Sequence, residues 1–251
     1  MVIKRVMPCL LFNGSSLVKT KKFKKPVYIG DPINAIKIYN EKEVDELVFL
    51  DINASIEKRK PDFEMIKQIT SECFMPFTYG GGVSNIDDFK TLFSLGVEKV
   101  ALNTLILKSP ETVKQAVAMF GAQAIISVVD IKSSLFGKQK IYNKTGFSYG
   151  KSIKSYLHYL QDEIGVGEIL IQNVDREGTW EGYDHELILE LSKECKVPLI
   201  ALGGANSPQD IERVLYTSGA DGSAIGSLAV FQKKDMGVLI KFPNRNLIIK
   251  E

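Results

Sequence analysis

The sequence predicts an α/β fold of the TIM-barrel type, in which eight parallel strands form a barrel inside a ring of helices. Two observations support this prediction. Short β-branched runs alternate with amphipathic segments along the 251 residues, and an internal repeat divides the chain into halves. Strands joined through helices pair in parallel by right-handed crossovers, and eight such units in about 250 residues is the size of this barrel. An open doubly wound sheet is the alternative.

The strands are predicted from short runs rich in Val, Ile, Leu and Phe. They are Arg5–Leu10, Glu46–Asp51, Phe77–Gly80, Lys99–Leu102, Ala124–Asp130, Glu168–Gln172, Leu199–Leu202 and Gly222–Ile225. Between them, helices are predicted where an amphipathic segment opens at Ser, Asp or Asn and closes near Gly, and examples are 31–42, 85–96, 109–121 and 207–219. The tail from residue 235 is weakly helical, so we expect the eighth outer helix to be short or replaced.

The internal repeat indicates two half-barrels. Residues 77–104 align with residues 200–227 at a constant offset, because 203−80, 219−96 and 226−103 all equal 123. An open sheet would not predict this pattern. No Pro/Gly-rich linker separates the halves, and we therefore expect one domain over residues 1–251. Residues 132–152 are longer than a usual strand-to-helix loop and alternate enough to form a small hairpin over the barrel mouth.

The composition indicates a globular protein of the cytoplasm. Hydrophobic residues make up 45% of the chain and charged residues 25%, close to the average for globular domains. Cys9, Cys73 and Cys195 are odd in number and lack the spacing of a metal or redox pair, so no metal or cofactor is expected. No apolar run approaches the roughly 20 residues that span a bilayer, and we expect no membrane association.

The charge pattern argues against a nucleic-acid partner but leaves one cluster open. A net charge of +2 is too small to indicate a nucleic-acid-binding surface. A local basic run follows the first strand, and two readings of it remain: a solvated loop, or a cluster that attracts phosphates to a nearby site. It consists of Lys19, Lys21, Lys22, Lys24 and Lys25.

Glycine corners recur at equivalent places in the two halves. A strand ends at Gly80, Gly81 and Gly82 in one half and at Gly203 and Gly204 in the other. The next strand ends at Asn103 and Thr104, or at Gly226 and Ser227. Backbone N–H groups at such corners and at helix starts favour anions. The glycines could instead only form tight corners, but their repetition favours a ligand with two phosphates, held at both ends.

Two aspartates end strands at the expected mouth. Asp130 closes the run IISVVD, where partial burial would raise its pKa toward neutrality and suit it to general acid or base chemistry. Asp51 closes VFLD in the same layer. A helix cap or a loop salt bridge is the alternative for both. Aligning PCLLF with SVVDI at an offset of 119 sets Leu11 opposite Asp130, and a leucine transfers no protons.

Two other sets of side chains complete the candidates. His158 and His185 lie in predicted outer helices, so we expect structural or solvent-facing roles and no Ser-His-Asp or Cys-His arrangement. Four charged residues begin strands, and they are either surface residues or an inward salt-bridged ring that closes the barrel bottom and could act as a gate. They are Arg5, Glu46, Lys99 and Glu168.

The sequence resembles the cyclase subunit of imidazole glycerol phosphate synthase over nearly its full length. The blocks that carry the resemblance include DELVFLDINAS, FTYGGGV, EKVALNT, GAQAIISVVDIK, GEILIQNVDREGTWEGYD and LIALGGA. The resemblance implies a barrel that takes ammonia from a glutaminase docked on its N-terminal face. At the C-terminal mouth a bisphosphorylated ribonucleotide would be cyclised and cleaved.

The resemblance also assigns roles to residues already singled out. The four charged strand starts match the family's ammonia entrance, and the two sets of glycine and polar corners match its two phosphate sites. Lys19 and Asp51 belong to the implied substrate site, and Glu177, Gly178 and Thr179 match a substrate loop. Asp130 matches the second of two catalytic aspartates, whereas Leu11 stands where the first belongs.

The missing aspartate separates three hypotheses. The leading one is a divergent copy that relays ammonia to a separate ATP-dependent amidotransferase acting on a nucleotide-activated sugar in surface-polysaccharide biosynthesis. The first alternative is a working histidine-pathway cyclase in which Asp51, Lys19 or a water replaces the missing group. The second is a non-catalytic scaffold or activator of the glutaminase.

Overall fold

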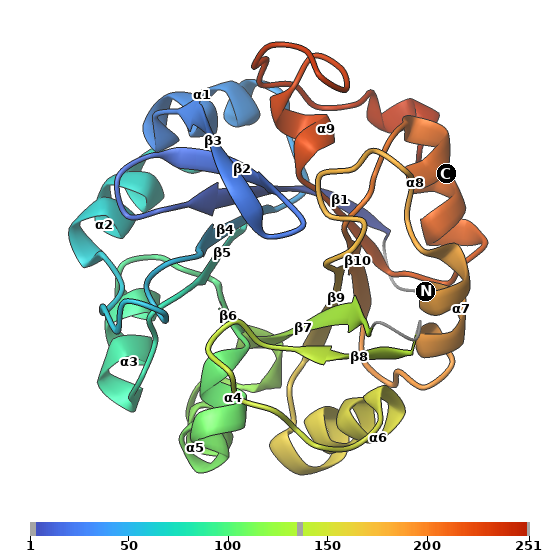
Figure 1. Ribbon diagram of the computed structural model, residues 1–251. Helices are drawn as coiled ribbons and strands as arrows, with labels where there is room; N and C mark the ends of the chain where they lie inside the picture. Colours follow the sequence, from blue (N-terminus) through green and yellow to red (C-terminus); the bar gives the residue numbers. More distant parts are fainter. Residues whose placement is uncertain (1–3, 135–137, 250–251) are drawn as a thin grey trace.

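The computed structural model describes residues 4–134 and 138–249, and within them eight parallel strands close into a barrel (Figure 1). The last strand pairs in parallel with the first, through Arg5 with Gly222 to Pro8 with Ile225, which excludes an open sheet. Around the barrel the strands are β1 (Arg5–Phe12), β4 (Leu47–Asp51), β5 (Phe77–Gly80), β6 (Lys99–Leu102), β7 (Ile125–Ser133), β9 (Glu168–Asn173), β10 (Leu199–Leu202) and β11 (Gly222–Ile225). The predicted TIM barrel is confirmed.

Helices surround the barrel, and most begin where the sequence places a capping residue. The side chains of Asp31, Asp62, Ser152, Asp184 and Ser207 each accept a backbone N–H at a helix start. The helices are α1 (Pro32–Glu41), α2 (Phe63–Glu72), α3 (Ile86–Ser94), α4 (Thr104–Lys108), α5 (Pro110–Phe120), α6 (Ile153–His158), α7 (His185–Ser192), α8 (Pro208–Tyr216) and α9 (Ser227–Val230). A π-helix (Tyr159–Ile164) continues α6, and 3₁₀ turns lie at Ala122–Ala124 and Arg245–Leu247. The eighth outer helix is short, as expected, since α9 is followed by an irregular tail.

The alternation of each strand divides the buried side chains into two cores. In β1, Met7, Cys9 and Leu11 point into the barrel, whereas Val6 and Leu10 pack outward against the helices. The interior cluster is almost wholly aliphatic. No helix in the described part of the chain is long and apolar enough to cross a membrane.

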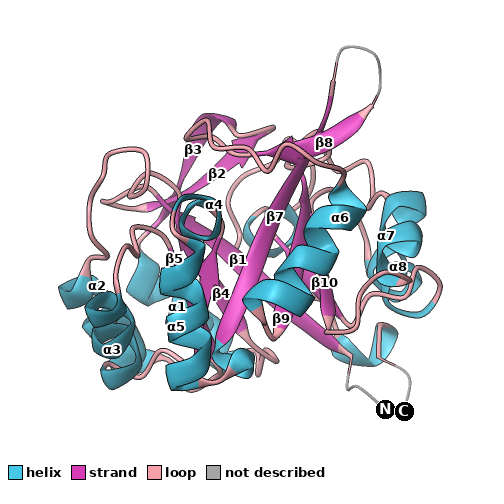
Figure 2. Ribbon diagram, turned by 90° about the horizontal axis from the view of Figure 1, so that it is seen from below, coloured by secondary structure: helices cyan, strands magenta, loops and turns pink. Residues whose placement is uncertain are grey.

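Two antiparallel hairpins rise beside the C-terminal ends of the strands, at the opposite end from the chain termini (Figure 2). β8 (Gln139–Tyr142) pairs with an extension of β7, which confirms the hairpin predicted within 132–152, although residues 135–137 lie outside the described residues. The other hairpin consists of β2 (Leu17–Lys21) and β3 (Lys24–Gly30).

The β2–β3 hairpin corrects the reading of the basic run as a loop. Its strand character comes from pairing with the end of β1, through Leu11 with Val18 and Phe12 with Leu17. Lysine has little preference for strands, so the local sequence does not show this pairing. The turn residues Lys22 and Phe23 both have positive φ, 54° and 60°, which is the conformation of a type I′ turn.

Candidate active site at the barrel mouth

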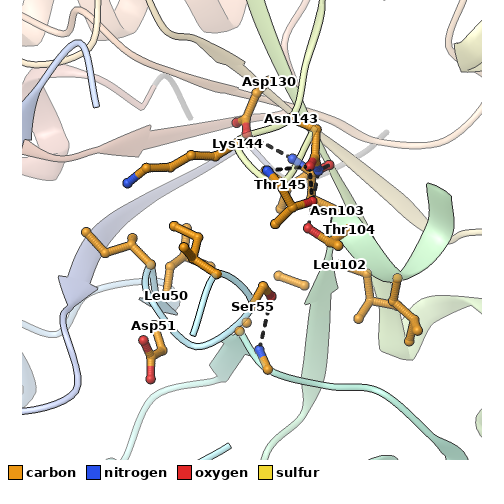
Figure 3. Close-up of a pocket in the computed structure, with 18 of the residues that line it drawn as sticks. Leu50, Asp51, Ser55, Leu102, Asn103, Thr104, Asp130, Asn143, Lys144 and Thr145 are labelled. Atoms are coloured by element: carbon orange, nitrogen blue, oxygen red, sulfur yellow. Dashed lines mark hydrogen bonds between the residues drawn. The ribbon is translucent and has the colours of Figure 1, made fainter. Parts of the chain in front are cut away.

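The mouth of the barrel holds a cavity of about 160 Å³. It lies at the C-terminal ends of the strands, where TIM-barrel enzymes carry their active sites. Its floor includes Leu11, Leu50 and Val128, and its walls include Gly82, Asn103 and Asp130 from the predicted site. Figure 3 shows Leu50, Asn103 and Asp130 around a common space, with Lys144 reaching across it from the loop after β8.

Asp130 points into this cavity from β7 because Ile126 and Val128 precede it on the inward face of the strand. Its Oδ2 accepts a hydrogen bond of 2.8 Å from the Asn103 side chain, while its buried Oδ1 has no partner among the described residues. Burial raises the pKa of Asp130 to about 7; the Asn103 bond acts in the opposite direction and the Glu177 charge in the same one. Asp130 can therefore exchange a proton near neutral pH.

A polar network holds Asn103 in place, and part of it was not predicted from the sequence. Asn143 Nδ2 donates to Asn103 Oδ1 at 2.9 Å and to Thr104 Oγ1 at 3.2 Å. The Asn143 Oδ1 in turn accepts from the backbone N–H and the hydroxyl of Thr145. Asn143 follows β8, so the hairpin brings it to the mouth, and no local signal in the sequence marks it.

Leu11 stands inside the mouth where the resemblance implies an acid. Its side chain is 4% exposed and packs in the interior cluster, and its backbone lies in register with Leu50 of β4. Among the described residues that line the cavity, the carboxylates are Asp51 and Asp130. No other acidic side chain in the described part of the chain lines this cavity.

The Asp51 carboxylate is ion-paired and hydrogen-bonded within the loop that follows β4. Its Oδ2 lies 3.2 Å from Nη1 of Arg59, and its Oδ1 accepts the backbone N–H groups of Asn53 and Ala54. In Figure 3 it lies across the cavity from Asp130, with its carboxylate directed away. This geometry is the loop salt bridge that the sequence left open as an alternative.

Glycine is required at these corners because neighbouring backbone leaves no room for a side chain. Gly81 and Gly82 have φ of 123° and 72°, and an added Cβ would come within 2.5 Å of the Asp51 carbonyl and 2.6 Å of the Arg59 carbonyl. Gly203 is crowded in the same way by the Asn173 carbonyl, at 2.6 Å. The two halves therefore share one corner geometry, in which Gly203 corresponds to Gly81 and not, as the constant offset of 123 predicted, to Gly80. Packing explains these glycines whether or not a phosphate binds there.

The two halves differ in the space beside these corners. Gly81, Gly82, Asn103 and Thr104 border the large cavity. The corresponding residues of the second half border a separate cavity of about 10 Å³, which has room for about one water. These are Gly203, Gly204, Gly226 and Ser227. The sequence predicted two equivalent sites, and the structure makes them unequal.

A buried ion pair occupies the second half of the mouth. Lys19 Nζ lies 2.5 Å from Glu177 Oε1, with side chains 6% and 1% exposed. Glu177 also accepts from the Thr20 hydroxyl and from the backbone N–H of Phe23, each at 3.1 Å. Gly178 borders the same small cavity. Thr179, expected in a substrate loop, lines neither cavity, because its hydroxyl donates to the Arg176 carbonyl.

At the opposite end of the barrel, the four charged strand starts form the predicted ring. Arg5 lies 2.7 Å from Glu46 and 3.0 Å from Glu168, and Lys99 lies 3.1 Å and 3.0 Å from the same two carboxylates. Thr78 donates a further hydrogen bond to Glu46. The charges therefore point inward and neutralise one another, and the surface alternative is wrong.

Both histidines lie in outer helices, as expected, but His185 makes a Ser-His-Asp contact that was not expected from the sequence. His185 lies between the Ser218 hydroxyl and the Asp210 carboxylate, and the half-exposed His158 contacts Glu194 on the outer ring. Among residues 4–134 and 138–249, no group of three or more His, Cys, Asp or Glu side chains could hold a metal ion.

Comparison with known proteins places the chain in a family. Residues 5–235 match the family model described as "Histidine biosynthesis protein". A Pseudomonas aeruginosa protein provisionally named imidazole glycerol phosphate synthase subunit hisF2 is 42% identical, over 98% of each chain. A Vibrio vulnificus protein provisionally named subunit hisF3 is 38% identical, over 97% of this chain and 94% of its own. Imidazole glycerol phosphate synthase subunit HisF of Methanococcus vannielii is 33% identical, over 99% and 98%. The chain therefore belongs to the histidine biosynthesis protein family and, within it, to the HisF-type cyclase subunits of imidazole glycerol phosphate synthase.

Proposed function

We propose that this chain is the barrel subunit of a glutamine amidotransferase complex and relays ammonia from a glutaminase to an acceptor enzyme, without cyclising a substrate of its own. The acceptor enzyme would be an ATP-dependent amidotransferase acting on a nucleotide-activated sugar in surface-polysaccharide biosynthesis. The observation that carries this proposal is Leu11 at the mouth. Asp51 is paired with Arg59, so Asp130 is the carboxylate of the cavity lining that has no ion-pair partner among the described residues. The numbered names hisF2 and hisF3 of two relatives fit a family with additional copies of this subunit.

The charged ring at the barrel bottom suits an ammonia entrance. Its two cations and two anions are paired, and side-chain exposure is 19% for Arg5 and 17% for Lys99, so the ring faces the surface on which a glutaminase would dock. A charged ammonium ion would lose its hydration on entering the aliphatic interior, whereas neutral ammonia loses much less. The ring and the interior together would pass ammonia and exclude ammonium.

The interior between ring and mouth is packed by side chains, as in other barrels of this type. Several of these side chains are small, among them Cys9, Ala101 and Ala224. Burial raises the pKa of the Cys9 thiol to about 12, which keeps it neutral along the path. Passage of ammonia would then need only rotation of neighbouring aliphatic side chains.

At the mouth, Asp130 is suited to receive the ammonia. Its free Oδ1 would accept an N–H bond, and its carboxyl group exchanges a proton near pH 7. In a cyclase, losing one of two cooperating acid or base groups costs roughly 10² to 10⁴ in rate. We therefore expect negligible cyclisation and an intact relay.

An isotope experiment tests the relay. The complex with its cognate glutaminase and acceptor enzyme is given glutamine labelled with ¹⁵N in the amide, in a large excess of unlabelled ammonium salt. Relayed ammonia yields labelled product, and Lys99→Ala should lower the labelled fraction because the ring is broken. Lys90→Ala, which breaks an exposed pair with Asp87, is the matched control. Unlabelled product from the wild type, with its nitrogen taken from the bulk ammonium, would refute the relay.

A histidine-pathway cyclase is the second candidate, favoured by the family description and by the Methanococcus vannielii relative. Purified chain is given the bisphosphorylated ribonucleotide and ammonium, in parallel with that relative. We expect turnover at least 10²-fold below the relative's. Comparable turnover would establish the cyclase instead. A chain that only raises glutaminase activity, with no labelled product, would be the scaffold or activator.

A further inference from the structure

We propose that Asn143 is a positioning residue for Asp130: it fixes the direction of the Asn103 side-chain amide, so that Asn103 donates to the Asp130 carboxylate and cannot accept from it. Asn143 directly follows β8, so the β7–β8 hairpin delivers it to the mouth. The hydrogen bonds involved do not depend on any ammonia path. Only the use of the carboxylate to receive ammonia rests on the proposed function.

The direction of the Asn143 amide is set by a backbone group of its own loop. The Thr145 N–H donates to Asn143 Oδ1 at 2.9 Å. A backbone N–H can only donate, so the oxygen of this amide must face Thr145 and its NH₂ group must face the other way. The Asn143 NH₂ group then donates to Asn103 Oδ1 at 2.9 Å and to Thr104 Oγ1 at 3.2 Å.

The same rule fixes the Asn103 amide. Because Asn143 offers it only N–H groups, the Asn103 oxygen faces Asn143 and its NH₂ group faces β7. There the Asn103 NH₂ group donates to Asp130 Oδ2 at 2.8 Å. Asn103 could accept from a protonated Asp130 only if its amide turned over, and this would set two NH₂ groups against each other. The direction of one backbone N–H is therefore transmitted through two amides to the carboxyl group.

Burial makes this direction matter for the ionisation of Asp130. Asn143 is 9% exposed and Asp130 is 8% exposed, so water is a poor substitute for either partner. A donor favours the charged carboxylate, whereas an acceptor favours the protonated acid. Burial raises the pKa of Asp130 to about 7, and the Asn103 bond opposes that rise. With Asn143 removed, Asn103 can turn and accept from the neutral acid, and the pKa of Asp130 should rise further.

The β7–β8 hairpin thereby controls how much of Asp130 is ionised at neutral pH. In the observed position of the hairpin, Asn103 occupies Oδ2 of the carboxyl group and leaves Oδ1 without a partner among the described residues. An ionised carboxylate with one free oxygen accepts an N–H group, whereas a protonated acid does so less well. The hairpin therefore prepares Asp130 to receive ammonia.

Other titratable groups surround Asp130 from neighbouring elements. They are Glu177 after β9 with its partner Lys19, Asp51 at the end of β4 with its partner Arg59, Lys144 after β8, and Tyr156 on α6. Among them, the charge of Glu177 raises the pKa of Asp130. A direct effect of any of these groups would persist in a chain without Asn103, whereas an effect of Asn143 through Asn103 would not.

The ionisation of Asp130 is measured on the purified full chain by NMR of ¹³C-labelled aspartate carboxyl groups, with Asp130→Asn to assign the resonance. We expect a wild-type midpoint at the pKa of about 7. Asn143→Leu keeps the size of the side chain and removes its amide, so it should raise the midpoint by about one pH unit. Thr145→Val is the matched control, because it removes a hydroxyl that donates to the same amide but keeps the backbone N–H. It should move the midpoint by less than about 0.3 unit. Equal shifts in the two variants would contradict the proposal.

A double-mutant cycle tests whether Asn143 acts through Asn103. In the Asn103→Leu background, Asn143→Leu should move the Asp130 midpoint by less than about 0.3 unit, because the amide that it directs is gone. A shift as large as in the wild-type background would overturn the proposal, since Asn143 would then act directly through solvation or through Lys144. Circular dichroism confirms that each variant is folded.

The wild type provides a measurement that does not depend on the folding of a variant. One proton of the Asn103 NH₂ group should shift with the Asp130 titration, and its nuclear Overhauser contacts should be the same at pH 5 and pH 9. An Asn103 amide that turns over as Asp130 is protonated would refute the proposal.

The outcome is separable from that of the proposed function. Unlabelled product in the isotope experiment, together with the expected shift of the Asp130 midpoint in Asn143→Leu, would refute the relay alone. Labelled product together with a midpoint that does not respond to Asn143→Leu would refute the positioning role alone.

Discussion

The charged side chains at the two ends of the barrel differ in whether they are paired with opposite charges. At the bottom, Arg5 and Lys99 each contact both Glu46 and Glu168, so four buried or half-buried charges compensate one another. At the mouth, Asp130 has an amide partner and, within the described residues, no ion-pair partner, and the aliphatic Leu11 lines the same cavity. The comparison shows that burial alone does not decide ionisation. Burial raises the pKa of Asp130 to about 7, and the hydrogen bond from Asn103 lowers it too little to offset that burial.

The largest expected effect is the pH dependence that Asp130 gives to stability. Its pKa is about 7 in the folded chain against an ordinary value of 3.8, so between these values the folded state holds a proton that the unfolded state has released. Stability therefore falls as pH rises through this window, by up to roughly 4 kcal/mol at 1.36 kcal/mol per unit. Asp130→Asn should lose this fall.

Urea unfolding of wild type and Asp130→Asn at pH 5 and pH 8 measures the effect. Asp87→Asn, at an exposed position, is the control for removing a carboxylate. A wild-type-minus-variant difference that stays constant between the two pH values would show that Asp130 has a counter-charge in solution, and the contrast between the two ends would disappear.

The second largest effect on stability is expected from a substitution in the salt-bridged ring. Lys99→Ala leaves Glu46 and Glu168 with Arg5 as their cation, and breaking a buried pair costs about 3 to 5 kcal/mol. We expect the lower end, about 3 kcal/mol, because Lys99 is 17% exposed. The same substitution at Lys90, in an exposed pair, should cost about 0 to 0.5 kcal/mol. Chemical denaturation compares them, and similar costs would mean that the ring is hydrated and not dry.

The Leu11 side chain should contribute about as much to the free energy of unfolding as an ordinary core leucine beside a cavity. Leu→Ala in a core costs about 2 to 5 kcal/mol, and we expect about 2 kcal/mol because the neighbouring cavity already exists. Leu247→Ala, with a side chain 59% exposed, should stay within about 0.5 kcal/mol. If thermal unfolding gives both variants the same small loss, Leu11 is not packed and the mouth is more open than described.

The smallest effect is expected at the hairpin that closes the second half of the mouth. Lys22 adopts positive φ in the type I′ turn, where Asn is favoured. Lys22→Asn should stabilise the chain by about 0.5 to 1 kcal/mol. Lys24→Asn, in the adjoining strand, should be neutral or slightly destabilising. A gain at both positions would indicate relief of charge repulsion among the lysines, and not relief of backbone strain.

Some of the site was readable from sequence because it depends on strand ends and alternation. The inward direction of Asp130 follows from the alternation of IISVVD, and that of Leu11 from the alternation of β1. The ring was predicted as one of two alternatives, since a charged residue at a strand start can face either way. Asp51 illustrates the limit, because its pairing with Arg59 depends on the path of a loop.

The amino-acid sequence by itself determined the barrel, its two halves and the corners where glycine is required, since strand alternation, helix periodicity and capping are local properties. Only the tertiary structure decided that the cavities beside the glycine corners of the two halves differ in size. Lys19 and Glu177 are 158 residues apart, and Asn143 reaches Asn103 across 40 residues, so neither contact exists until the barrel closes and the hairpins fold over it. The physical reason is that an ion pair or a hydrogen bond depends on the distance between two groups in space, and the local sequence pattern does not predict that distance.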